Sequence, residues 1–167
     1  MTNLVLVALF LVGVVLLHVT VLPALLPTTF RPDALLAATV TWGALAGYRQ
    51  AVALGVIGGF LVDLWSDTPM GLSGLIVGMV AFATVLGEVP LLPANVLFPL
   101  VLTFFGELVA QGVRFLLFQA IGRPVEGSEP LPALVVLTAT STALLVLGFY
   151  PVTRWLTRRL AGPRLEW

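Results

Sequence analysis

The sequence has no cysteine, no lysine, a single histidine and few charged residues of either sign. Without cysteine the chain has no disulfide, no thiol nucleophile and no thiolate metal ligand, and one histidine does not make a metal centre. Charged residues are 10% of the 167 residues, against about 25% in soluble domains, which is too little to cover a water-facing surface. The formal net charge is +0, so charge gives no basis for binding nucleic acid. No cofactor is expected.

Long apolar runs dominate what is present. Hydrophobic residues make up 59% of the chain and its mean hydropathy is +1.10, a composition that suits a surface facing lipid. A spanning helix takes about 20 residues, so a chain of this length holds about six spans and no domain outside the membrane. We therefore predict a single all-α domain of six transmembrane helices. Turns rich in proline, glycine and charge place the spans at approximately 4–26, 34–48, 51–65, 70–87, 95–118 and 131–153.

The arginines predict the orientation. With an even number of spans, both ends of the chain lie on one side of the membrane. Five arginines fall on that side and two on the other, leaving aside Arg114, which lies within a span. By the positive-inside rule, both termini are predicted to be cytoplasmic. The larger group is Arg49, Arg154, Arg158, Arg159 and Arg164, and the smaller is Arg31 and Arg123.

A polar stripe lies within the fifth predicted span. Thr103, Glu107, Gln111 and Arg114 are spaced four, four and three residues apart, which puts them on one helical face. Ionisable side chains in a span are costly unless they face protein or water. One interpretation is an ion or proton relay, or a polar substrate cavity. The interpretation we favour is a helix-packing clamp or a docking stripe for another protein's span, because opposite charges on one face neutralise each other.

Comparable depth in the membrane suggests partners for this stripe. Asp63, near the end of the third span, is predicted to pair with Arg114. His18, in the first span, is predicted to contact Glu107. A lone histidine in a helix bundle is more often held by hydrogen bonds than by a metal.

Small residues recur at helical spacing in the second, third and fourth spans. Three pairs of glycines four residues apart would let helix backbones approach closely. Packing between these spans is the simpler interpretation, and a groove for a partner is the alternative. The pairs are Gly43 with Gly47, Gly55 with Gly59, and Gly74 with Gly78.

Two further features have simple interpretations. The run from Arg154 to Arg159 combines arginines with Trp155, as in an anchor at the membrane interface, although contact with a cytoplasmic protein is an alternative. Asp63 and Asp67 lie close together, where hydrolysis or glycosyl transfer is conceivable, but Pro69 and Gly71 favour a turn. No nucleophile elbow, phosphate loop or metal-ligand spacing occurs. We predict no enzymatic activity.

The stretch from Phe30 to Gly71 resembles the MreD family of rod shape-determining membrane proteins. The resemblance covers about a quarter of the chain, and the remainder agrees in length and in the six-span pattern. The matching residues are Phe30, Arg31, Pro32, Asp33, Trp42, Arg49, Gly55, Gly59, Asp63, Leu64, Ser66 and Gly71.

The resemblance implies a non-enzymatic scaffold in the bacterial inner membrane, within the cell-elongation complex that directs peptidoglycan synthesis. Its main partner would be MreC, bound through membrane helices and surrounded by lipid, with RodA, a penicillin-binding transpeptidase and MreB in the same complex. The family is similar in fold to the substrate-binding subunits of energy-coupling-factor vitamin transporters. The alternative function is therefore a transport subunit that binds a small molecule through Glu107, Gln111 and Arg114.

Overall fold

The computed structural model describes residues 2–26, 31–66, 69–88, 95–120, 122 and 132–160. These residues form helices and the turns that join them, and no strand occurs among them. The prediction of an all-α protein is confirmed for this part of the chain. The helices are α1 (Thr2–Leu16), the π-helix η1 (Leu17–Val21), α2 (Leu22–Leu25), α3 (Ala34–Ala46), α4 (Tyr48–Asp63), α5 (Leu72–Phe82), the 3-10 helix η2 (Ala83–Glu88), α6 (Leu97–Ala120) and α7 (Pro132–Leu160).

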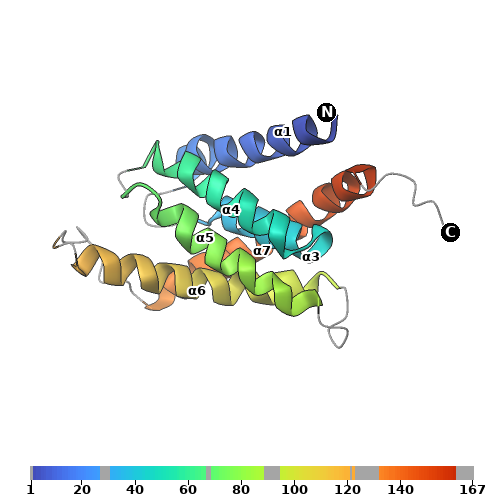
Figure 1. Ribbon diagram of the computed structural model, residues 1–167. Helices are drawn as coiled ribbons and strands as arrows, with labels where there is room; N and C mark the ends of the chain where they lie inside the picture. Colours follow the sequence, from blue (N-terminus) through green and yellow to red (C-terminus); the bar gives the residue numbers. More distant parts are fainter. Residues whose placement is uncertain are drawn as a thin grey trace.

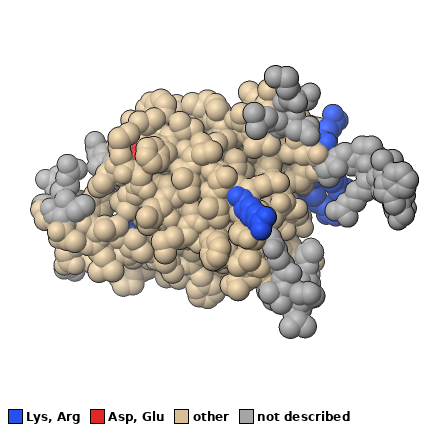
Figure 2. Space-filling view, viewed as in Figure 1, with Lys and Arg blue, Asp and Glu red and all other residues tan. Residues whose placement is uncertain are grey.

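Three helical stretches are long and apolar enough to cross a membrane: Val5–Leu25, Leu97–Ala120 and Pro132–Leu160. Much of their apolar surface is exposed, as at Leu9 and Phe105, which are 63% and 58% exposed. Contact with lipid costs such side chains no free energy, whereas contact with water is unfavourable for them. Figure 2 shows a face with almost no charge, on which arginine atoms gather toward the right-hand half. These features indicate a membrane protein.

Helix α3 forms the centre of the bundle. Every residue from Ala34 to Gly43 is buried, and α3 packs against α4, α5, α6 and α7. Trp42 is completely buried against the ring of Phe10, with 5.2 Å between the ring centroids, and its indole N–H donates to Gln50 Oε1 at 3.2 Å. At 13 residues α3 is about 20 Å long, which is shorter than the hydrocarbon core of a bilayer. The neighbouring helices cover it on all sides from Ala34 to Gly43.

Glycines allow α4 and α5 to cross in close contact. A Cβ atom added to Gly59 would overlap the backbone of Gly74, and one added to Gly74 would lie 2.9 Å from the carbonyl oxygen of Val56. Cβ atoms added to Gly55 and Gly78 would lie 3.1 Å and 2.9 Å from valine side chains of the facing helix. Two of the three predicted glycine pairs therefore face each other across one contact inside the chain.

The third glycine pair serves α3. A Cβ atom on Gly43 would overlap the side chain of Thr84. The absence of a side chain at Gly43 therefore lets η2 pack against α3. Gly47 ends α3 with φ +96°, a conformation that other residues rarely adopt, and α4 begins at the next residue. This sharp turn sets α3 and α4 side by side.

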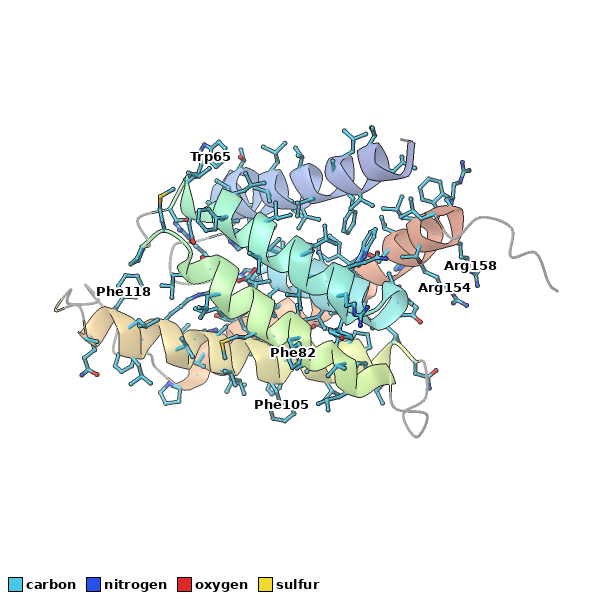
Figure 3. The ribbon with its side chains drawn as sticks, viewed as in Figure 1. Trp65, Phe82, Phe105, Phe118, Arg154 and Arg158 are labelled. Carbon is cyan, nitrogen blue, oxygen red and sulfur yellow. The ribbon has the colours of Figure 1, made fainter. Side chains whose placement is uncertain are left out.

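Helices alternate between two ends of the bundle. Figure 1 shows that α1 begins and α7 ends at the same end. Figure 3 shows Arg154 and Arg158 at this end, and Trp65 and Phe118 at the other. We call these the arginine end and the Trp65 end.

Candidate functional site

A buried carboxylate at the start of α3 joins three helices. Asp33 is 3% exposed, and its Oδ1 accepts the N–H of Leu36 at 2.9 Å, which caps the first turn of α3. Its Oδ2 accepts a hydrogen bond of 2.7 Å from Arg114 Nη2, on α6. Its own N–H donates to Thr142 Oγ1, on α7, at 3.0 Å. Asp33 thus fixes the start of α3 against both α6 and α7.

The polar face of α6 continues this network inward. Arg114 Nη1 lies 3.8 Å from Glu107 Oε1, and Gln111 Nε2 donates to the same oxygen at 3.2 Å. Glu107 is 1% exposed. Its Oε2 and the hydroxyl of the buried Thr103 have no hydrogen-bond partner among the described residues. The guanidinium of Arg114 therefore lies between two buried carboxylates.

His18 completes the group from the π-helix η1. Its Nδ1 lies 3.6 Å from Asp33 Oδ1, within ion-pair range when the ring is protonated but too far for a hydrogen bond. A π-helix adds a residue to a helical turn and often occurs at functional sites. We call the resulting set the polar cluster: His18, Asp33, Glu107, Gln111, Arg114 and Thr142.

Both of the contacts predicted for this region, Asp63 with Arg114 and His18 with Glu107, were wrong. Among the described residues, the acids within ion-pair distance of Arg114 are Asp33 and Glu107, not Asp63. His18 meets Asp33 rather than Glu107. The charged pair Arg31 and Asp33 is expected at the water boundary from sequence, whereas Asp33 is 3% exposed and lies inside the bundle. An aspartate immediately before an apolar run is an N-cap signal, which would have placed Asp33 on α3.

Asp63 has a separate role at the start of α5. Its Oδ2 accepts the N–H groups of Gly71 at 2.8 Å and Ser73 at 3.1 Å, which are among the donors that a helix N-terminus leaves unsatisfied. Gly71 has φ +90°, so glycine is suited to this turn. The turn interpretation of this region fits these bonds. Asp67 and Phe30 lie outside the described residues.

Other residues singled out in the sequence lie at the two ends of the bundle. Arg49 Nε donates to the hydroxyl of Tyr48 at 3.3 Å. Arg31 is exposed and, with His18 and Pro32, lines a cavity of about 320 Å³ at the Trp65 end. At the arginine end, the guanidinium of Arg159 lies 4.6 Å from the centre of the Trp155 ring, a cation–π distance.

The geometry of the polar cluster is that of a clamp. Buried ion pairs stay charged only when they are well hydrogen-bonded, and the bonds of Asp33 connect residues 109 positions apart in the chain. No group of three histidine or acidic side chains able to hold a metal occurs among the described residues. The cluster fixes α3, α6 and α7 in one arrangement.

Comparison of the chain with protein-family models, with curated proteins and with solved structures found no significant match in any of the three.

Proposed function

We propose that this protein is a six-span scaffold of the MreD type in the bacterial inner membrane. It binds the membrane helix of MreC and helps position peptidoglycan synthases in the cell-elongation complex. The resemblance of residues 30–71 supports this proposal, and so do the roles of the matching residues. Asp33 and Asp63 each start a helix, and Gly55 and Gly59 bring α4 onto α5, so the motif defines a packed frame.

The observation that carries the proposal is an apolar groove between α1 and α7. Its volume is about 420 Å³, and its lining includes Leu9, Gly13, Gly148 and Val152. A Cβ atom on either glycine would have no atom of the chain within 4 Å, unlike the glycines packed between α4 and α5. Small residues in a membrane helix let another helix approach closely. We assign this groove to the spanning helix of MreC.

Filling the groove should abolish the partner's binding. In Gly13→Leu and Gly148→Leu variants, the new side chain occupies the volume that the partner helix needs while touching little of its own chain. We expect co-purification of MreC with the tagged protein to fall about tenfold or more, since overpacking costs about 1–3 kcal/mol and 1.4 kcal/mol is a factor of ten. Quantitative pull-down from membranes measures the ratio.

Gly112 provides a matched control for this experiment. It is exposed on α6 and also has open space at its Cβ position, so Gly112→Leu should leave MreC bound. Equal retention of MreC by all three variants would refute the groove assignment. A purified protein that brings down no MreC and retains a vitamin-sized molecule would refute the scaffold function and favour the transport subunit.

The six-span topology has its own test. In this topology α3, α4 and α5 also cross, and the arginine end is cytoplasmic. Reporter fusions after Arg49 and after Gly122 should then show cytoplasmic and extracytoplasmic activity, respectively. Reporters on the same side would contradict six spans.

A further inference from the structure

A cavity at the Trp65 end combines polar and apolar walls. Its volume is about 320 Å³, and its lining includes His18, Leu22, Arg31, Pro32, Trp65 and Ser66. It lies beside the polar cluster, because His18 belongs to both. The apolar groove between α1 and α7 offers no comparable set of polar groups, so this cavity is the better candidate for a ligand with a polar head.

The charges around the cavity favour an anion. Arg31 is exposed, and no acidic residue of the described chain lies within ion-pair distance of it. The two nearby carboxylates are already engaged: Asp33 by Arg114 at 2.7 Å, and Asp63 by two backbone N–H groups of the α5 turn. Within the described part of the chain, Arg31 is thus a cation without a compensating acid, and it lines the same cavity as His18.

The surroundings favour an anion that belongs to a lipid. Exposed apolar side chains reach this end of the bundle, where Leu25 is 74% and Trp65 69% exposed. Tryptophan and arginine are typical of the level at which acyl chains meet headgroups. Leu22 and Val62 are among the apolar residues that line the cavity. A phosphate at Arg31 would leave attached acyl chains against the apolar surface of η1 and α2.

We propose that this cavity binds the phosphate headgroup of an anionic phospholipid. Arg31 supplies the main charge-assisted contact, since guanidinium and phosphate geometries match. His18 and Trp65 line the same cavity and supply a polar and an apolar side to it. The proposal stands independently of MreC binding, because the cavity and the α1/α7 groove have different linings.

The test measures lipid binding by the purified full-length chain. Native mass spectrometry in a neutral detergent would count adducts of phosphatidylglycerol and of phosphatidylcholine, titrated separately. Wild-type protein should bind phosphatidylglycerol in preference. Arg31→Gln should weaken this binding about tenfold, the effect of one charge-assisted hydrogen bond, and Arg31→Lys should retain more of it. Inorganic phosphate at equal concentration should not displace the lipid.

Arg49→Gln is the matched control, because it removes an exposed arginine at the start of α4, outside the cavity and outside the Arg154–Arg159 anchor. It should keep the preference of the wild type. Equal binding of the two lipids by wild-type protein, unchanged binding by Arg31→Gln, or an equal loss in Arg49→Gln would overturn the proposal. Displacement by inorganic phosphate would overturn the lipid assignment. Should Arg31→Gln fold poorly, Arg31→Lys, which keeps the charge but not the planar fork, should still bind phosphatidylglycerol less tightly than the wild type.

Discussion

Replacing Arg114 with glutamine is expected to lower the free energy of unfolding by about 3–5 kcal/mol, the usual cost of removing one partner from a buried ion pair. Arg114 is the cation that contacts both Asp33 and Glu107. Without the guanidinium, the two buried carboxylates have no opposite charge between them, and burying them becomes unfavourable. Reversible unfolding in mixed detergent micelles, followed by tryptophan fluorescence, measures the change.

A second variant separates the ion pair from other effects of the substitution. Asp33→Asn keeps an oxygen able to cap α3 and removes the charge that Arg114 compensates. The double variant Asp33→Asn/Arg114→Gln should therefore lose less stability than the sum of the two single variants. Arg154→Gln, at an exposed position, should change stability by less than about 0.5 kcal/mol. Additive losses in the double variant would show that the two side chains do not act as a pair.

The second large effect is expected at Gly59, where even one methyl group has no space. Gly59→Ala would drive its Cβ into the backbone of Gly74, and a backbone cannot rotate away as a side chain can. Helices α4 and α5 must then separate, and we expect a loss of more than about 2 kcal/mol. The loss of folded monomer on gel filtration after stepwise heating would record it.

Two other glycines, Gly58 and Gly13, provide controls measured in the same way. Gly58→Ala meets the methyl ends of Leu35 and Leu11, at 2.6 Å and 2.9 Å, which can adjust their rotamers. It should cost less than Gly59→Ala. Gly13→Ala meets no atom within 4 Å and should be close to neutral. A Gly59→Ala protein as heat-resistant as Gly13→Ala would contradict the close crossing of α4 and α5.

Much of the fold could be predicted from the apolar runs in the sequence and from the residues that interrupt them. Apolar runs interrupted by proline, glycine and charge predicted helices close to those observed. Helical spacing also put Glu107, Gln111 and Arg114 on one face, and the bonds between their side chains agree with that placement. These features depend on neighbours three or four residues apart, which helix geometry alone brings together.

Contacts between distant segments could not be read in the same way. The sequence shows Asp33 beside Arg31 and Pro32, which resembles a polar turn in water. Its burial depends on α6 and α7, whose positions follow from packing and not from local pattern. The π-helix that carries His18 was also missed, because an extra residue in a helical turn leaves no mark in hydrophobic periodicity.

The order of biosynthesis gives the bonds of Asp33 a further consequence. Arg114 follows Asp33 by 81 residues and Thr142 by 109. At about 5–20 residues per second, the ribosome delivers Arg114 roughly 4–16 s after Asp33. During that interval the carboxylate of Asp33 has no cation from α6. The bonds that hold the start of α3 against α6 and α7 can therefore close only after most of the chain has been made.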